Sequence, residues 1–300
     1  MSDGKIYFLR AFTTDRGEGG NAAAVVLDAE DIAPVRRQAI AARAAVSETA
    51  FVSKGHRDNL WTLDFYTPTK PIAHCGHATV AAFSLMTQIG RIPGGQNLFM
   101  QAAAGGEFAV KSTADGRVFL RLPPAAYESV DSGWLEEVLR AMGFHGGASA
   151  LAREPVIADC ANRFLLLPLS GRPVLAALEP RFDALARLGR QKKLVGFYPF
   201  YRVQDGAEGH AEARLFAPDF GIEEESATGT AAAPLACWLA SQNAGPEPRG
   251  PWILRQGALM RVPSPSRIEA AVETEAGRIE HVWVGGFARV QNEPRPETAP

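Results

Sequence analysis

The chain has 300 residues, of which 46% are hydrophobic and 21% charged, and its formal net charge at pH 7 is -2. A chain of this length exceeds what one hydrophobic core usually organises, so we expect two domains with a binding site between them. Acidic and basic residues are interspersed, which leaves no positive field to attract nucleic acid or anionic lipid. Neither partner is expected.

No apolar run reaches the roughly 18 residues of a membrane span, and the N-terminal sequence lacks the charged-then-apolar order of a signal peptide. A cytoplasmic protein is therefore expected. The three cysteines, Cys75, Cys160 and Cys237, are scattered and odd in number. Their spacing supports neither a disulfide framework nor a four-ligand zinc site.

Strand-like runs bounded by turn residues dominate the first third of the chain, at 5–12, 23–27, 49–53, 60–66 and 106–111. They predict a curled sheet. The segment 32–45 has helical composition, and 76–89 carries apolar residues at three- and four-residue spacings that are typical of a largely buried helix.

A similar pattern begins again after Pro123 and Pro124, with a helix at 134–142, strands at 163–167, 196–203 and 211–216, and a helix from residue 230. We therefore expect one domain over 1–124 and a second over 125–280, with a strand near 281–290 returning to the first. The tail 292–300 is polar and proline-rich, and is expected to be frayed.

The two apolar helices begin alike. Cys75-Gly76-His77-Ala78 opens the first and Thr228-Gly229-Thr230-Ala231 opens the second, 153 residues later. Small, glycine-containing helix starts leave backbone N–H groups open to a ligand, and the helix dipole adds partial positive charge there. Two such starts facing one cleft would hold an anion from both sides.

Motifs spread over nearly the whole chain resemble the PhzF-like (phenazine biosynthesis) proteins. They are Phe12-Thr13, Gly20-Asn21-Ala22-Ala23, Ser47-Glu48-Thr49-Ala50-Phe51, Tyr66-Thr67-Pro68-Thr69, Cys75-Gly76-His77-Ala78-Thr79, Arg214-Leu215-Phe216-Ala217-Pro218 and Glu224-Glu225-Ser226-Ala227-Thr228-Gly229-Thr230-Ala231. The resemblance implies the diaminopimelate-epimerase-like fold. That fold is α+β, with two pseudo-symmetric domains that each wrap a curled, mostly antiparallel sheet around a central helix.

The resemblance also implies roles for individual residues. Glu48 falls on the catalytic carboxylate that relays a proton between two carbons of the substrate, and His77 and Glu225 fall on positions that assist it. The expected substrate-binding residues are Asn21, Cys75, Gly76, Thr228, Gly229 and Thr230. A cofactor-independent isomerase or epimerase acting on a small carboxylate is implied, and homodimers are common in this family.

Several positions depart from the family pattern. Glu225 replaces the usual aspartate, Ser226 replaces a common proline, and His74 stands where an apolar residue is usual. The expected pocket is therefore not that of the phenazine enzyme itself, and the substrate stays open.

Each candidate also has a structural interpretation. Glu48 lies in an otherwise apolar, small stretch, where burial could bring its pKa toward the working pH, but it could also face water at a strand edge. His77 could cap its helix instead of relaying protons, and Glu225 could merely favour the helix dipole. Arg214 could contact an anionic substrate or pair with Asp219 or Glu212.

Two alternatives to this mechanism stay open at the sequence level. A racemase that uses two thiols is disfavoured, because the position equivalent to Cys75 in the second half is Thr228, whose hydroxyl is a far weaker acid. A racemase with the single thiol of Cys75 remains, as does a non-catalytic small-anion binding protein. The irregular spacing of His74, Cys75 and His77 predicts no metal site, and no nicotinamide, flavin or pyridoxal fingerprint is present.

Overall fold

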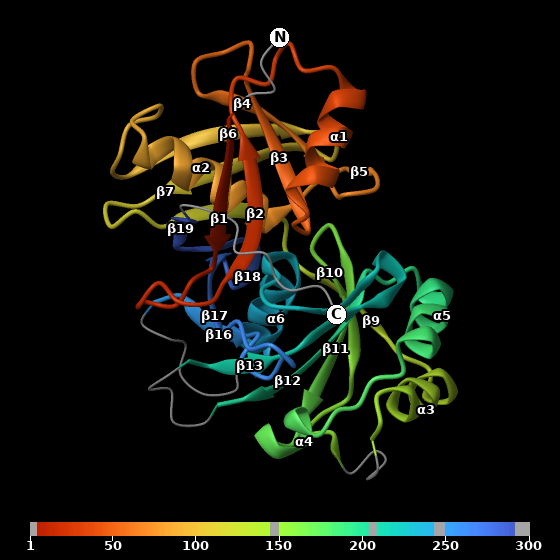
Figure 1. Ribbon diagram of the computed structural model, residues 1–300. Coiled ribbons are helices and arrows are strands. Elements are labelled where there is room, and N and C mark those ends of the chain that lie inside the picture. The colour runs from red at the N-terminus through yellow and green to blue at the C-terminus, as the bar shows by residue number, and fades with distance from the viewer. Residues whose placement is uncertain (1–4, 145–149, 204–208, 243–249, 292–300) are drawn as a thin grey trace. The chain divides into compact units, whose positions relative to one another are not determined.

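The computed structural model describes residues 5–144, 150–203, 209–242 and 250–291 (Figure 1). The chain forms two compact units. The first runs up to Arg121 and includes the segment that begins at Gly285, and the second runs from Leu122 to Val284. The tail 292–300, which was expected to be frayed, lies outside the described residues. Within the described part of the chain, no helix is both long and apolar enough to cross a membrane.

In the first unit, helices α1 (Pro34–Ala44) and α2 (Gly76–Gln88) pack against a mostly antiparallel sheet. Its strands are β1 (Ile6–Ala11), β2 (Asn21–Val26), β3 (Glu48–Lys54), β4 (Leu60–Tyr66), β5 (Pro71–Ile72), β6 (Asn97–Ala103), β7 (Gly106–Ser112), β8 (Val118–Leu122) and β19 (Ala288–Gln291). The strand order is β19-β1-β2-β3-β4-β6-β7-β8, and β5 pairs with β4. The pairs β2–β3 and β4–β6 are parallel.

Helix α2 forms the core of the first unit. Every residue from Gly76 to Met86 is buried, and the helix packs against β1, β2, β3 and β19. A helix that is apolar on all sides has to be surrounded by protein. The curled sheet provides these surroundings.

In the second unit the helices are α3 (Ser132–Ala141), α4 (Arg172–Ala176), α5 (Phe182–Lys192) and α6 (Gly229–Ser241), with a 3-10 turn η2 (Pro218–Phe220). The strands are β9 (Ala126–Ser129), β10 (Val156–Asp159), β11 (Arg163–Leu169), β12 (Gly196–Arg202), β13 (Ala211–Ala213), β14 (Leu215–Ala217), β15 (Ile222–Glu225), β16 (Trp252–Gln256), β17 (Ser266–Glu275) and β18 (Arg278–Gly286). The main order is β9-β10-β11-β12-β13-β16-β17, and β14 links β12 to β15.

Helix α6 repeats the position of α2. Both helices have 13 residues, and their first residues, Gly76 and Gly229, are 153 positions apart. Their N-cap residues, Cys75 and Thr228, share an extended backbone conformation. Helix α6 is buried from Gly229 to Leu239 and packs against β10 and β17. The expected α+β class, with a central helix in each half, is confirmed.

Candidate active site

Two polar side chains of the first unit lie at the start of neighbouring strands. Asn21 begins β2 and Glu48 begins β3, and the two strands run parallel, with Ala23 opposite Glu48. Because parallel strands start at the same edge of a sheet, Asn21 and Glu48 share that edge. Helix α1 ends just before it, where Ala45 adopts the left-handed conformation and turns the chain toward β3.

The N-terminus of α2 supplies the other members of this group. Cys75 is the N-cap residue and His77 lies in the first turn, and neither makes a side-chain hydrogen bond that caps the helix. The helix also has no acidic residue in its first turn. The N–H groups of Gly76 and His77 therefore lack the usual side-chain acceptor, and the interpretation of His77 as a helix cap is wrong.

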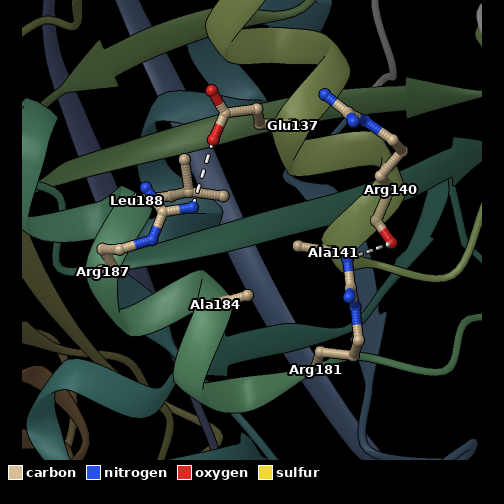
Figure 2. A pocket seen from close by; sticks show the side chains of 7 residues that line it. All are labelled: Glu137, Arg140, Ala141, Arg181, Ala184, Arg187 and Leu188. Carbon is tan, nitrogen blue, oxygen red and sulfur yellow. Dashed lines mark hydrogen bonds and ion pairs between the residues drawn. The ribbon is translucent and has the colours of Figure 1, made fainter.

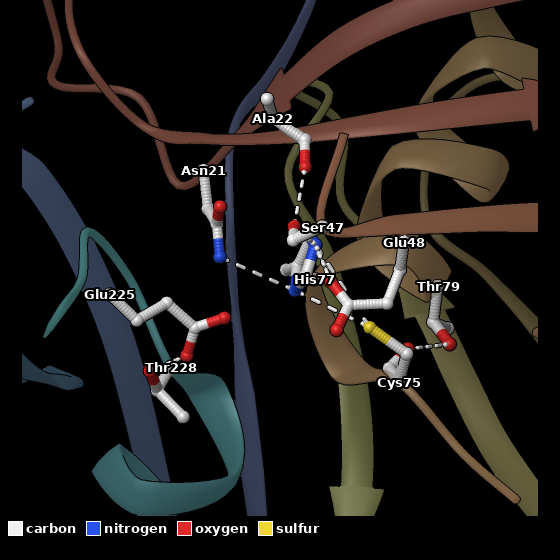
Figure 3. Close-up of polar contacts among 9 residues, drawn as sticks. All are labelled: Asn21, Ala22, Ser47, Glu48, Cys75, His77, Thr79, Glu225 and Thr228. Atoms are coloured by element: carbon white, nitrogen blue, oxygen red, sulfur yellow. Dashed lines mark hydrogen bonds and ion pairs between the residues drawn. The ribbon is translucent and has the colours of Figure 1, made fainter. Parts of the chain in front are cut away.

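The imidazole of His77 contacts the other side chains of this group (Figure 3). Its Nε2 lies 3.1 Å from Glu48 Oε2 and 3.5 Å from Ser47 Oγ, while Nδ1 lies 3.3 Å from Cys75 Sγ and 3.5 Å from Asn21 Nδ2. The hydroxyl of Ser47 donates to the carbonyl of Ala22 at 3.2 Å, which leaves its lone pairs toward the imidazole.

Glu48 and His77 form a buried ion pair. The two residues are 7% and 5% exposed, so the interpretation of Glu48 as a solvated strand-edge residue is wrong. Burial acts to raise the pKa of Glu48, but the charge and hydrogen bonding of His77 outweigh it and hold that pKa below its ordinary value of 4.5. The expectation that burial brings this pKa toward the working pH is therefore wrong, because burial also places Glu48 beside a cation. Burial acts to lower the pKa of His77, but Cys75 and Glu48 raise it well above 6.5.

The thiol of Cys75 is kept neutral. Burial raises its pKa, and the nearby His77 offsets this only in part. At pH 7 the charge that acts on His77 therefore comes from the Glu48 carboxylate. A neutral thiol is a poor base and a poor nucleophile, so the geometry favours Glu48 as the base of this group.

The ion pair should make stability depend on pH. Its contribution is fully present between about pH 4.5 and 6.5, is lost on the acid side as Glu48 gains a proton, and is lost on the alkaline side as the pH passes through the raised pKa of His77. We expect Glu48→Gln to lower the free energy of unfolding by about 2 kcal/mol near pH 6, and by less near pH 10. Urea unfolding at both pH values measures this, and a deficit that grows with pH would contradict the assignment.

Glu48, Cys75 and His77 also offer three potential metal-ligand atoms within 4.8 Å of one another. A metal ion would have to displace the proton of the imidazolium and that of the neutral thiol, because only deprotonated groups coordinate metals. A role of these three groups in proton transfer needs no loss of these protons to a metal ion. His74, the other residue of the sequence motif, has a pKa lowered to about 4 by burial, and its ring contacts those of Phe65 and Phe108.

The second unit holds the remaining predicted residues. Glu225 ends β15 and Thr228 is the N-cap residue of α6, which starts at Gly229 and Thr230. The Thr228 hydroxyl donates to Glu225 Oε2 (Figure 3). Like α2, helix α6 has neither a side-chain cap nor an acidic residue in its first turn. Glu225 is therefore bonded to the N-cap hydroxyl of this helix.

Comparison with known proteins identifies the family. A family model described as phenazine biosynthesis-like protein matches residues 9–293. The chain belongs to the phenazine biosynthesis-like family. An uncharacterized isomerase of Deinococcus radiodurans is 34% identical over 290 residues, which cover 94% of this chain and 91% of the relative.

Two further family members extend the comparison. The trans-2,3-dihydro-3-hydroxyanthranilate isomerase of Pseudomonas aeruginosa is 28% identical over 275 residues, covering 89% of this chain and 90% of that enzyme. The crystal structure of a PhzF-family protein of Bacillus anthracis superposes with a TM-score of 0.82 at 19% identity, covering 95% of this chain and 96% of that one.

These relatives make the chain an isomerase-type enzyme. The sequence-based assignment to the family, its fold and the expectation of an enzyme are confirmed. The alternative of a non-catalytic binding protein is set aside. The roles of the individual site residues remain predictions.

Arg214 corrects one detail of the sequence analysis. Its guanidinium pairs with both oxygens of Glu224, at 2.7 and 2.9 Å, and not with Asp219 or Glu212. It also donates to the carbonyls of Leu175 and Leu178. Arg214 is 8% exposed. Its bonds to Glu224 attach β15, the strand that carries Glu225, to the rest of the second unit.

A surface groove lies between α3 and α5 in the second unit (Figure 2). It encloses about 340 Å³ and is lined by Glu137, Arg140, Ala141, Arg181, Ala184, Arg187 and Leu188. Two of its arginines already have partners, because Arg187 pairs with Glu137 at 3.1 Å and Arg181 donates to the carbonyl of Arg140 at 3.3 Å. None of its lining residues is a predicted site residue.

Proposed function

We propose that this isomerase moves a proton between carbons of a small carboxylate substrate without a cofactor, with Glu48 as the general acid and base. The observation that carries the proposal is the buried Glu48–His77 ion pair at the N-terminus of α2. A buried carboxylate without a charged partner would become protonated. The imidazolium of His77 keeps Glu48 ionised, and so able to accept a proton.

The proposed reaction has two proton transfers. The Glu48 carboxylate takes a proton from a carbon next to the carboxylate or enamine system of the substrate, and the electron pair of the broken C–H bond spreads into that system. Glu48 then returns the same proton to a different carbon. Positioned acid/base catalysis of this kind contributes about 10²- to 10⁴-fold to the rate.

The start of α2 supports the carboxylate part of the proposal. The helix has no capping side chain and no acidic residue in its first turn, so its N–H groups at Gly76 and His77 suit an anion. Such groups stabilise negative charge that develops during proton removal. Asn21 and Cys75, which contact His77, are proposed to line the same part of the pocket.

The second unit is proposed to contribute Glu225 as a further acid/base group, with Thr228, Gly229 and Thr230 at the start of α6. The repeated, uncapped helix start supports this assignment. The similarity to the trans-2,3-dihydro-3-hydroxyanthranilate isomerase supports a cyclic carboxylate as one substrate class to test.

Replacing Cys75 by alanine separates this mechanism from that of a single-thiol racemase. Because burial keeps the thiol neutral, we expect Cys75→Ala to retain activity within about fivefold of the wild type, an effect of lost packing alone. Steady-state rates of the variant decide this. A loss as large as that of Glu48→Gln would assign the chemistry to the thiol.

Solvent exchange tests the proposed function. The protein is incubated in D₂O with a panel of amino acids and cyclic hydroxy or amino carboxylates, and NMR follows the loss of each C–H signal. We expect deuterium to enter at defined carbons of one substrate class. The variant Glu48→Gln is the negative control and should show no exchange. Binding of a panel member without any exchange or product would refute the proposal.

A further inference from the structure

Glu225 and Thr228 are held by a buried side chain that no sequence motif indicated. The amide of Gln256, at the end of β16, contacts three groups of this segment. Its Nε2 donates to the Glu225 carbonyl at 2.7 Å and to Thr228 Oγ1 at 3.2 Å, and its Oε1 accepts from the Thr228 backbone N–H at 3.3 Å. Gln256 is fully buried.

The orientation of this amide follows from backbone groups. The oxygen and nitrogen of a glutamine amide are hard to distinguish by shape, but a backbone N–H only donates and a carbonyl only accepts. The N–H of Thr228 therefore faces Oε1, and the carbonyl of Glu225 faces Nε2. The Thr228 hydroxyl accepts from Nε2, so its own proton is directed to Glu225 Oε2.

Tyr198 on β12 secures the other side of the amide. Its hydroxyl lies 3.0 Å from Gln256 Oε1 and has to donate to it. Burial and the nearby Glu225 raise the pKa of Tyr198, so the hydroxyl remains a donor at every working pH. The result is a chain of donors with one direction, from Tyr198 through Gln256 and Thr228 to Glu225.

The backbone next to Gln256 is packed just as tightly. Gly257 has φ +80°, and a Cβ atom there would lie 2.7 Å from the Ser226 carbonyl oxygen and 2.2 Å from that of Ser264. Only glycine fits both this conformation and this approach. The end of β16 is therefore fixed against the segment that carries Glu225 and Thr228.

We propose that Gln256, oriented by Tyr198, is a positioning residue that directs the Thr228 hydroxyl to Glu225 Oε2 and so keeps Glu225 ionised and able to accept a proton. The assignment of a catalytic role to Glu225 rests on the proposed function. The hydrogen-bond chain itself does not depend on it. Without Gln256 the hydroxyl could rotate to other acceptors, and the carboxylate would lose a hydrogen bond to its charged form.

The titration of the Glu225 carboxyl group tests the hydrogen-bond chain without any substrate. Carboxyl ¹³C NMR of protein labelled in glutamate follows it, and the resonance is assigned by its absence in Glu225→Gln. We expect Thr228→Val to raise the titration midpoint by about one pH unit. Gln256→Met and Tyr198→Phe should shift it in the same direction, and Thr228→Val/Gln256→Met should shift it no further than Thr228→Val alone.

Tyr127→Phe is the matched control, because Tyr127 also donates to the segment of α6, at the Pro234 carbonyl, without contacting Gln256. It should leave the midpoint unchanged. Tyr198→Phe removes a single oxygen, so it keeps the test decisive if Gln256→Met does not fold. A midpoint that moves in Thr228→Val but in neither Gln256→Met nor Tyr198→Phe would overturn the proposal.

Kinetic measurements then test whether this hydrogen-bond chain matters for catalysis. In an active enzyme, the acid limb of the pH–rate profile should move upward in Tyr198→Phe by the same interval as the NMR midpoint, with KM nearly constant. If the titrations shift and the wild type exchanges no substrate, the hydrogen-bond chain stands and the proposed function fails. A rise in KM without a shift of the profile would assign Gln256 and Tyr198 a purely structural role.

Discussion

Replacing Glu48 by glutamine should lower the rate of proton exchange by about 10³-fold or more, while substrate still binds. Glutamine has the same length and fits the same buried position, but its amide neither accepts nor returns a proton at carbon. The N–H groups at the start of α2 stay in place, so affinity for the carboxylate should change little. NMR exchange rates and calorimetric binding of the same substrate measure the two effects separately.

Two further variants serve as comparisons for Glu48→Gln. Glu48→Asp keeps the carboxylate but withdraws it by one methylene, and should lose about 10- to 100-fold through misplacement alone. Glu30→Gln is the surface control, because Glu30 is exposed and its carboxylate accepts from the Lys54 backbone N–H, away from the Glu48 group. Exchange that persists at the wild-type rate in Glu48→Gln would remove Glu48 from the mechanism.

The fold could be predicted where local patterns are strong. The helix predicted over 76–89 and the strand predicted over 60–66 agree within a residue with α2 and β4, because apolar spacing and turn residues define both. Strands β16 and β17 and helix α5 were missed. Strands such as β16 are held by pairing with β13 and β17, which are distant in sequence, and local propensity does not report such pairing.

The site shows the same division. The motifs predict Glu48 and His77 as site residues, but no motif indicates that Nε2 of His77 lies beside Ser47 or Nδ1 beside Cys75. Gln256 carries no motif at all. Its only signal is a polar residue at the buried end of an apolar strand, and this signal becomes informative once its partner atoms are known.

Replacing His77 by glutamine should have the next largest effect, a loss of about 10²-fold at neutral pH with a changed pH dependence. In the wild type, the imidazolium lowers the pKa of Glu48 against the opposing effect of burial. Without that charge, burial dominates and the pKa of Glu48 rises. Its base form is then lost at a higher pH, so the acid limb of the pH–rate profile should move upward.

The alkaline limb tests the same ion pair from the other side. His77 has a raised pKa, so wild-type activity should persist above pH 6.5 and fall only as the imidazolium loses its proton. His77→Gln has no such group and should lose this limb. His74→Gln is the matched control, because His74 is already neutral above about pH 4 and neighbours Cys75 in sequence; its pH–rate profile should match that of the wild type. If His77→Gln kept both limbs, the ion pair would not set the protonation state of Glu48, and burial alone would have to do so.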